Sequence, residues 1–564
     1  MHRLTLPLVL LLILAPPVRA AAFTVTTTDD TIDVLPGDGV CADGSGACSL
    51  RAAVMEANAS PGADTIDVPA GTYLFTQAGG AGDETDPSKD DLDVTEDLTI
   101  NGAGAALTVI NANERDRAFH VPFDSGASLT LTGLTLTNGD VDNGIMGGGA
   151  ILFNGDALLL QQVSITNNEA HISGGGISSL EPAATITLIE TTIRDNIAHT
   201  YGGGLISAGE MTIRRSTISG NLAWESGGGI TNTEHGPAVT ITASTISGNE
   251  AYDDGGGIDA YRGAAYTLTE VTVVNNTADR GGGFSLTAAG VQPSITLNNT
   301  LLAVNTPAHN QCRGSLTSGG HNLLQPDSGC TPGPDDLVST QAPGDMLGPL
   351  GDHGGATPTH TLPQTSDAID VGQCVLADGD QRGYTRMDMP GVPNDGGNGC
   401  DIGAVEYLDN PSEVILSNGS FEEPLAGTWS LIESGGGDGR ISHALAHSGD
   451  HLLLLRANGT TELIQQTAPV SGGAGDAVTL TVMVAGQNVS GGVKGAQVEL
   501  LAGGVPVGLK QCLFNQSGTF NWQPFECSFT AGATFDAVRV RIRWKGVSGG
   551  LLGMDSALLS VGLP

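Results

Sequence analysis

The chain of 564 residues is poor in basic residues, in aromatic residues and in charge overall. It has 22 Lys and Arg against 61 Asp and Glu, which gives a formal net charge of −39. A surface of that sign repels phosphate backbones, so we do not expect nucleic acid as a partner. Charged residues make up only 15% of the chain and aromatic residues 4%. This composition argues against a coiled coil, a helical bundle and a highly charged disordered chain.

Long apolar runs are absent from the sequence beyond its first residues. At the N-terminus, His2 and Arg3 precede the apolar run 4–18, and small residues at the −3 and −1 positions predict cleavage after Ala20. We therefore expect residues 1–20 to be a signal peptide and the mature chain to have no integral membrane segment. The predicted location is extracellular, as a secreted or cell-surface protein.

Cysteine pairs with the CxxC spacing of zinc sites are also absent, although the chain has eight cysteines. In an exported protein these cysteines predict structural disulfides. We expect sequence neighbours to pair, because short loops are the easiest to close. The expected bridges are Cys41–Cys48, Cys312–Cys330, Cys374–Cys400 and Cys512–Cys527.

Glycine is abundant instead, with 83 residues, and it marks an internal repeat. Six glycine triplets follow one another at steps of 25 to 28 residues, and a phrase of the type Ile-x-x-Asn-x-Ala precedes five of them. Short segments such as 186–188 and 239–241 alternate apolar and polar residues, which is typical of strands. A fixed period of this length with short strands predicts the stacked coils of a parallel β-helix. The triplets begin at Gly147, Gly174, Gly202, Gly227, Gly255 and Gly281.

The repeat predicts a role for each recurring residue. The asparagine of each phrase should pair its buried amide with the identical amide on the next coil. The Ile or Val three residues earlier and the Ala two residues later should face the core. The glycine triplets should lie where the chain turns tightly or takes a positive φ. The predicted column consists of Asn168, Asn196, Asn221, Asn249 and Asn276.

Motifs at the two ends of the repeat resemble a known family. Ser49 is placed to cap a helix whose apolar stripe would cover the first coil. The segment 48–58 (Cys-Ser-Leu-Arg to Ala-Asn) and Val-Pro-Ala-Gly-Thr-Tyr at 68–73 resemble the N-terminal CSLREA-type domain of secreted bacterial right-handed β-helix proteins. The glycine repeats resemble those of the pectate-lyase-like superfamily and of polymorphic outer-membrane proteins, and the closing run 348–406 is similar too. The resemblance implies an architecture that hosts lyases, hydrolases, adhesins and proteins without known chemistry.

The C-terminal part loses the repeat and shows longer alternating strands, such as 478–484 and 537–544. We expect a jelly-roll β-sandwich there. The motifs near its start (418–422) and near its end (554–556) resemble those of β-sandwich carbohydrate-binding modules and galactose-binding-like domains. This resemblance implies a structural calcium held by Glu422 and Asp555. Tryptophans could stack on sugars, or at least two of them belong to the core. These tryptophans are Trp429, Trp522 and Trp544.

The predicted fold is therefore all-β, with a right-handed parallel β-helix solenoid, an N-terminal capping helix and a β-sandwich. The expected divisions are a signal peptide (1–20), an N-terminal segment with the capping helix (21–62), the β-helix (63–407), a linker (408–414) and the carbohydrate-binding-like sandwich (415–564).

A short variable loop between each Asn-x-Ala phrase and its glycine triplet carries the residues that could bind a ligand. Stacking of the coils should place the aromatic residues of these loops in one stripe. His171 and His199 could also ligate a metal as stacked imidazoles, for which the sequence shows no evident third ligand. The candidate binding residues are His171, His199, Tyr201, Trp224, Tyr252 and Tyr261.

Acidic and basic residues of the same loops offer the only set suited to catalysis. A polysaccharide lyase needs a base and a group that neutralises the substrate carboxylate, whereas a glycoside hydrolase needs paired carboxylates. The alternative is an ordinary solvated turn or a weak cation site. The candidate catalytic residues are Asp253, Asp254, Asp259, Asp279, Arg262 and Arg280.

Two functions from different classes follow. Coils of nearly uniform length leave no long loops to wall a catalytic groove, which favours a non-catalytic protein that binds extracellular glycans for adhesion or matrix attachment. The alternative is a polysaccharide lyase or glycoside hydrolase that acts on an acidic polysaccharide and is targeted by the C-terminal module. The expected partner is an extracellular polysaccharide or glycan, the only expected cofactor is calcium, and the expected state is a monomer.

Overall fold

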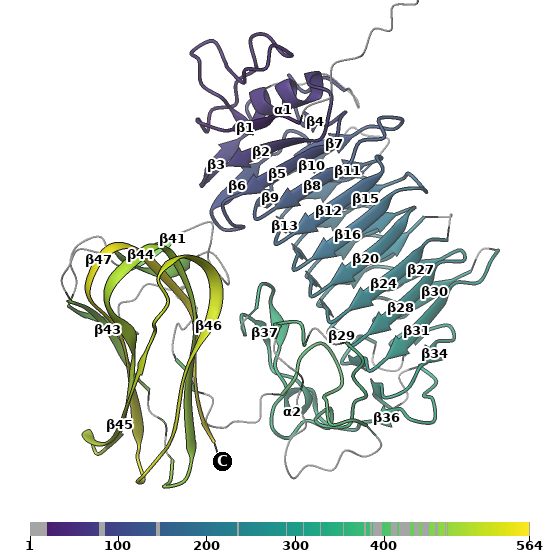
Figure 1. Ribbon diagram of the computed structural model, residues 1–564. Helices are drawn as coiled ribbons and strands as arrows, with labels where there is room; N and C mark the ends of the chain where they lie inside the picture. The colour runs from purple at the N-terminus through teal and green to yellow at the C-terminus, as the bar shows by residue number, and fades with distance from the viewer. Residues whose placement is uncertain are drawn as a thin grey trace, which may run out of the picture.

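Strands of two to five residues dominate the first 340 residues, and such short strands are stable only when they stack on one another. They form a parallel β-helix, shown in Figure 1. The structure is a computed structural model. It describes residues 20–562 except 78–84, 143–146, 234–235, 289, 308–309, 327–328, 354, 377–378, 384–385, 387–396, 408–413, 417–428, 434–438, 443–450, 457–460, 469 and 471.

One coil shows how the sequence makes this fold. Four strands follow one another along the chain and lie in four different sheets: β16 (Thr185–Ile189), β17 (Thr192–Arg194), β18 (Ile197–Ala198) and β19 (Leu205–Ser207). Each pairs in parallel with its equivalent on the next coil. In β16, the side chains of Ile186 and Leu188 are buried in the core, whereas that of Thr185 is exposed to solvent. The period-two pattern of the sequence therefore sets which face of each strand lies inside.

The coils build four sheets, which we call A to D. Sheet A contains β1 (Ala22–Thr24), β2 (Asp64–Val68), β5 (Leu98–Gly102), β8 (Leu129–Thr132), β12 (Ala157–Gln161), β16, β20 (Glu210–Arg214), β24 (Ala238–Thr242), β28 (Ala265–Thr269), β31 (Ser294–Asn298) and β34 (Thr317–Ser318). Sheet B contains β3 (Gly71–Leu74), β6 (Thr108–Asn111), β9 (Thr135–Thr137), β13 (Ser164–Thr166), β17, β21 (Thr217–Ser219), β25 (Thr245–Ser247), β29 (Thr272–Val274), β32 (Leu301–Ala303), β35 (Leu323–Leu324) and β36 (Leu337–Val338).

The other two sheets of the solenoid are shorter. Sheet C contains β4 (Leu92–Asp93), β7 (Phe119–Val121), β11 (Ile151–Phe153), β15 (Ile177–Ser179), β19, β23 (Ile230–Asn232), β27 (Ile258–Tyr261), β30 (Phe284–Thr287) and β33 (Cys312–Arg313). Sheet D contains β10 (Asp140–Val141), β14 (Glu169–Ala170), β18, β22 (Leu222–Ala223) and β26 (Glu250–Ala251).

The predicted asparagine column is confirmed and is one residue longer than predicted. Each Nδ2 donates to the Oδ1 of the asparagine on the next coil at 2.9 Å, from Asn168 through to Asn305. The column starts at the backbone N–H of Gly139, which donates to Asn168, and it ends where Asn305 donates to the Oε1 of Gln311. Each buried amide therefore satisfies its neighbour, as identical stacked residues can.

Two separate physical requirements explain the glycine triplets. The first glycine of most triplets takes a positive φ, as at Gly227 (+70°), where other residues are strained. The other two lie where neighbouring coils touch. A Cβ on Gly229 would stand 2.6 Å from the carbonyl oxygen of Gly257 and 3.1 Å from the Nδ2 of Asn249. The triplets therefore let the backbones of successive coils approach beside the asparagine column.

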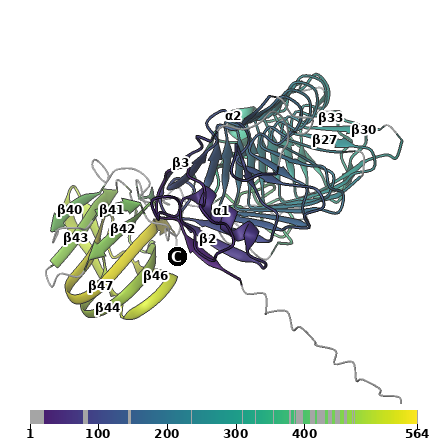
Figure 2. The ribbon, with the colours of Figure 1, turned by 90° about the horizontal axis from the view of Figure 1, so that it is seen from above.

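The helix α1 (Leu50–Ala59) covers the N-terminal end of the solenoid, as Figures 1 and 2 show. Ser49 caps it, because its hydroxyl accepts from the N–H of Ala52. Arg51 is fully buried and binds the carboxylate of Asp30 and the carbonyl groups of residues 87 and 89–91. Glu56 is also buried and accepts from two backbone N–H groups of the preceding loop. The Cys-Ser-Leu-Arg phrase thus supplies a helix cap and an arginine that ties the loops together.

After Val338 the described residues form no further coil of the solenoid, and the chain folds back along the outer face of sheet B. This C-terminal segment, residues 339–407, contains α2 (Pro343–Met346) and the antiparallel pair β37 (Leu350–Gly351) and β38 (Thr359–His360). Threonines of sheet B hold it. Thr217 donates to the carbonyl of Pro358, and Thr245 donates to the side chain of Gln381, both at 2.6 Å. The segment therefore covers sheet B with specific hydrogen bonds.

The last part of the chain forms antiparallel sheets around a core of its own, consistent with a β-sandwich. Its two longest strands pair with each other along most of their length. The strands are β39 (Val414–Ile415), β40 (Ser430–Glu433), β41 (Gly439–Ser442), β42 (His451–Arg456), β43 (Thr461–Ala468), β44 (Ala477–Ala502), β45 (Val505–Leu513), β46 (Gly518–Thr530) and β47 (Ala537–Gly562).

All eight cysteines form disulfides, and the predicted pairing of sequence neighbours is confirmed in all four. Within the described part of the chain, no helix has both the length and the apolar character needed to span a bilayer. The predicted signal peptide (1–20), except for Ala20, and the predicted linker (408–414), except for Val414, lie outside the described residues.

Candidate ligand-binding surface

The first residues of the variable loops stack as predicted. The ring centroids of His171 and His199 are 4.2 Å apart, and those of His199 and Trp224 are 3.8 Å apart with planes only 9° from parallel. Tyr252 takes the next position. Trp224 and Tyr252 are 45% and 52% exposed. We call these four residues the aromatic column.

Backbone hydrogen bonds between coils fix the column. The N–H groups of His199, Trp224 and Tyr252 each donate to the carbonyl of the alanine one coil earlier, at 3.0 to 3.2 Å. The ladder of sheet D beside them sets the same register, with Ala170, Ala198 and Ala223 in line. The repeat itself therefore places the four rings, because each occupies the third position after a column asparagine.

The column ends at Tyr252, because the next coil carries Asp279 at this position. A cavity of about 480 Å³ opens there. Its lining combines one aromatic ring, two carboxylates and two threonine hydroxyls in an open depression. The lining residues are Glu250, Ala251, Tyr252, Thr277, Ala278, Asp279, Thr306 and Pro307.

Tyr201, also predicted to belong to the stripe, lies in a second line of residues nearer to sheet C. Single bridges join Tyr201 to Ser226, Ser226 to Asp254 and Asp254 to Arg280. A hydrogen bond to Glu225 raises the pKa of Tyr201 to about 12 because it stabilises the protonated phenol. Tyr201 is therefore an exposed hydrogen-bond partner of an acid rather than a member of the column.

The predicted catalytic residues divide into a cluster and scattered members. Asp254 is nearly buried and pairs with Arg280 at 2.8 Å and with Arg313 through its other oxygen. Sequence reasoning missed Arg313, because its coil has no glycine triplet to mark the position. Asp253 and Asp279 are exposed on the loops. Arg262 lies over the ring of Tyr261, 5.2 Å from its centroid.

Asp259 completes the cluster from the middle of β27. It is 4% exposed, and burial raises its pKa to about 7, with the charge of Asp254 adding to the effect. The hydroxyl of Thr287 donates to it at 3.0 Å. Asp254 is thus held between two arginines, whereas burial leaves Asp259, with its pKa of about 7, only partly ionised at neutral pH. Two carboxyls in such different environments are a pattern of acid–base sites. The low exposure of Asp259 limits its access to a substrate.

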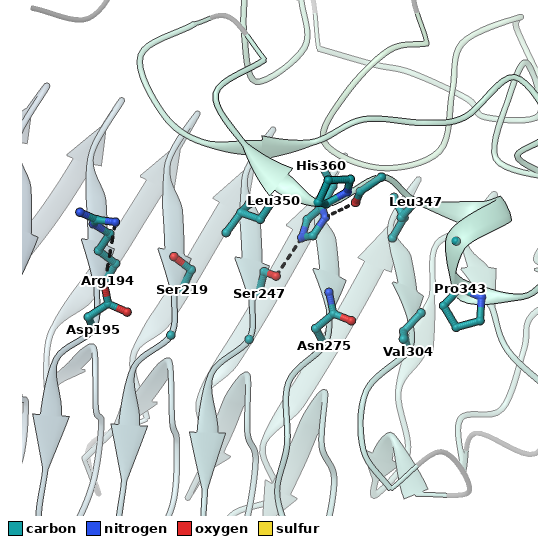
Figure 3. A pocket seen from close by; sticks show the side chains of 15 residues that line it. Arg194, Asp195, Ser219, Ser247, Asn275, Val304, Pro343, Leu347, Leu350 and His360 are labelled. Carbon is teal, nitrogen blue, oxygen red and sulfur yellow. Dashed lines mark hydrogen bonds and ion pairs between the residues drawn. The ribbon is translucent and has the colours of Figure 1, made fainter. Parts of the chain in front are cut away.

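The C-terminal segment creates a cleft that the sequence did not lead us to expect. Its volume is about 610 Å³, and it lies between the ends of the sheet B strands and residues 343–360. Figure 3 shows His360 reaching from β38 to Ser247, with an Oγ–Nε2 distance of 2.8 Å. The Nδ1 of His360 lies 2.7 Å from the carbonyl of Gly348, which makes it the donor and leaves Nε2 to accept from Ser247. Burial lowers the pKa of His360 and so favours this neutral form.

Among the residues that the structure describes, two groups of side chains have the composition of metal sites. Glu169, His171 and His199 form one on the loops of the aromatic column. The other lies inside the N-terminal coils, where His120 Nδ1 stands 2.8 Å from Asp93 and Arg117 pairs with Asp91. In this second group, His120 is already paired with Asp93, and Asp91 is already paired with Arg117.

In the sandwich, Trp429 and Trp544 lie in the core, as the alternative interpretation held, so they offer no surface to a sugar. Trp522 is partly exposed. Asp555 is fully buried in β47. Glu422, its expected partner at a calcium ion, lies outside the described residues, and the calcium site stays a prediction.

Comparison with known proteins identifies the solenoid. Residues 123–301 match the family model of the right-handed β-helix region. The match covers the coils from β8 to the start of β32, including the aromatic column and most of the acidic cluster. No curated protein matches the chain. The resemblance of residues 48–58 to the CSLREA-type domain stays a prediction.

Three solved structures are similar to the chain at low identity. The complex of TmCBM61 with β-1,4-galactotriose is 16% identical, with 26% of this chain and 96% of that chain covered and a TM-score of 0.21. A family 16 carbohydrate-binding module is 18% identical, with 26% and 98% covered and a TM-score of 0.21. The enzymatically active domain of tailspike protein 4 from bacteriophage CBA120 is 11% identical, with 90% and 67% covered and a TM-score of 0.23.

Proposed function

We propose that the protein binds glycans outside the cell, at the open end of its aromatic column. The observation that carries the proposal is the cavity of about 480 Å³ beside Tyr252, with Glu250 and Asp279 in its lining. An exposed aromatic ring offers a surface for the C–H face of a sugar. Carboxylates and threonine hydroxyls bind the sugar hydroxyls around that face. The rigid coils hold these groups in place before binding, which reduces the entropy cost.

The charge of the protein selects among glycans. Glu250 and Asp279 line the cavity, and the whole chain carries a formal charge of −39. A polyuronate would meet repulsion from both, whereas a neutral or amino sugar would not. The ligand class we propose is therefore a neutral or basic glycan, bound for adhesion or matrix attachment without chemical change. Four disulfides support an oxidising, extracellular location.

A glycan array with the intact protein tests this proposal. We expect neutral or amino-sugar glycans to be retained and Tyr252→Ala to weaken their binding about tenfold, through loss of the stacking surface. Phe123→Ala is the matched control, because Phe123 is also an exposed aromatic residue but lies on a different turn. An array with no such ligand, or unchanged binding by Tyr252→Ala, would contradict the proposal. Trp522→Ala tests a second contribution from the sandwich in the same assay.

Glycoside hydrolysis is the second candidate, favoured by the raised pKa of Asp259 near the arginine-paired Asp254. In this function Asp259 would protonate the leaving group and Asp254 would act as the second carboxylate. Reducing-sugar release from the array's bound glycans, abolished by Asp259→Asn, would establish it. Unchanged glycans after long incubation would leave binding alone as the function.

A further inference from the structure

Four side chains with metal-binding atoms converge from three successive coils at the start of the aromatic column. Asp140 lies on β10, Glu169 lies on β14 with His171 directly after it, and His199 follows β18. The ligand atoms of Glu169, His171 and His199 all lie within 4.8 Å of one another. We propose that these four residues bind one divalent transition-metal ion of the Zn²⁺ type.

The distances suit a single ion. The Nε2 of His199 lies 2.6 Å from Glu169 Oε1, and the Nε2 of His171 lies 3.7 Å from the same oxygen. His171 Nε2 is also 3.7 Å from Asp140 Oδ1. Donors around a tetrahedral zinc, with bonds of about 2.0–2.1 Å, are about 3.3 Å from one another. The measured distances lie on both sides of this value, so small side-chain rotations bring the donors to one ion.

The fold holds these donors in place. The backbone N–H groups of His171 and His199 each donate at 3.0 Å to a carbonyl of the preceding coil, at Val141 and Ala170. The ring of His199 is packed between the rings of His171 and Trp224. Donors that are oriented before binding lose little entropy when the ion arrives.

The charges at the site favour a cation. Asp140 and Glu169 are direct partners in the parallel ladder between β10 and β14, so two like charges lie on neighbouring strands. Among the described residues, the buried Oδ1 of Asp140 has no hydrogen-bond partner. A divalent ion would remove the repulsion and give this oxygen a ligand bond.

The donor types define the class of metal. Imidazole nitrogens suit Zn²⁺, Cu²⁺ and Ni²⁺, whereas Ca²⁺ and Mg²⁺ prefer sites made of oxygen alone. The side chains of His171, Glu169 and Asp140 are each more than a third exposed, so an ion can enter from solvent. This site is therefore distinct in place and chemistry from the calcium site expected in the sandwich.

Metal binding would join three coils by ligand bonds in addition to their hydrogen bonds. Because the ion binds the folded chain, it should raise the unfolding temperature in proportion to the logarithm of its free concentration. Glycan binding at Tyr252 does not depend on it, since the two sites lie at opposite ends of the aromatic column.

The experiment uses the full chain without an affinity tag, first treated with a chelator. We expect calorimetry to show one Zn²⁺ bound per chain, an increase in unfolding temperature with Zn²⁺ but not with Ca²⁺, and visible absorption of bound Co²⁺ typical of four-coordination. Glu169→Gln and His199→Ala should each weaken Zn²⁺ binding at least tenfold. His353→Ala is the matched control, because this histidine lies on the loop after β37, and it should bind Zn²⁺ like the unaltered protein.

Two results would overturn the proposal. One is the absence of Zn²⁺ binding by the unaltered chain, and the other is unchanged affinity in the double variant His171→Ala/His199→Ala. Glu169→Gln preserves the size of the side chain, so a loss of binding in this variant with an unchanged far-UV circular dichroism spectrum supports the site without a folding artefact.

Discussion

The side-chain amide of Asn221 donates to the Oδ1 of Asn249 at 2.9 Å, one coil further along the solenoid. The same nitrogen also donates to the carbonyl of Ile193 on the previous coil. One side chain thus bonds to the coil before it and the coil after it, entirely inside the core. The stability of the solenoid should depend strongly on such residues.

Asn221→Ala should lower the free energy of unfolding by about 3 kcal/mol, because it leaves buried donors of Asn196 without their acceptor. Chemical denaturation followed by circular dichroism measures the change. Asn167→Gly is the control, since Asn167 is exposed, takes a positive φ and is outside the column. A loss as small as that of the control would show that the column contributes little.

Gly229→Ala should also cost about 3 kcal/mol or more, for a steric reason. The added Cβ would stand 2.6 Å from the carbonyl oxygen of Gly257, which belongs to the next coil's backbone and cannot move alone. Thermal unfolding of this variant is compared with that of Gly44→Ala. At Gly44 a Cβ meets nothing within 4 Å, so near-wild-type stability is expected there. Equal unfolding temperatures for the two variants would argue against close contact of the coils.

Asp259→Asn should stabilise the protein at neutral pH. Burial raises the pKa of Asp259 from 3.8 to about 7, so the folded chain keeps a proton that the unfolded chain releases. The free energy of unfolding is therefore unaffected by this residue below about pH 4, where Asp259 is protonated in both states. It falls as the pH rises from 4 to 7, because the unfolded chain loses the proton first. The loss is at most about 4 kcal/mol. Unfolding temperatures from pH 4 to 8 should show a gain for Asp259→Asn that grows with pH, unlike the exposed Asp253→Asn. A gain independent of pH would refute this assignment.

His360→Ala should loosen the C-terminal segment from sheet B, because it removes the hydrogen bonds to Ser247 and Gly348. Limited proteolysis with mass spectrometry should then show faster cleavage within residues 339–407 than in His353→Ala. Burial lowers the pKa of His360 below 6.5, so docking should be strongest above that pH and weaken as the pH falls through it. Identical cleavage of the two variants at every pH would count against this role.

The repeat made the solenoid predictable. The positions of Asn249 and Tyr252 follow from the period alone, because stacking places equivalent residues of successive coils in contact. The disulfides were predictable for a similar reason, since each closes a short loop. The contact between Thr245 and Gln381 was not, because it joins residues 136 positions apart with no periodic pattern between them. The cleft under residues 343–360 could not be predicted for the same reason, because it too is formed by residues far apart in the sequence.

The proposed metal ligands beside His171 show a second limit of prediction from the repeat. The period groups residues at the same position of each repeat, and so it paired His171 with His199. Glu169 occupies a different position, the variable residue of the Asn-x-Ala phrase, and it contacts the histidines only because side chains reach across neighbouring positions. Contacts between different positions of neighbouring repeats depend on side-chain rotamers, which the period of the sequence does not reveal.

Every coil from β12 to β28 presents to its neighbour the same amide, the same pair of close-packed glycines and the same apolar rows. A coil removed or duplicated as a unit would therefore find matching partners on both sides. The length of the solenoid, and with it the separation between the two proposed ligand sites on the loops, can therefore change by whole coils without a change in the contacts between coils.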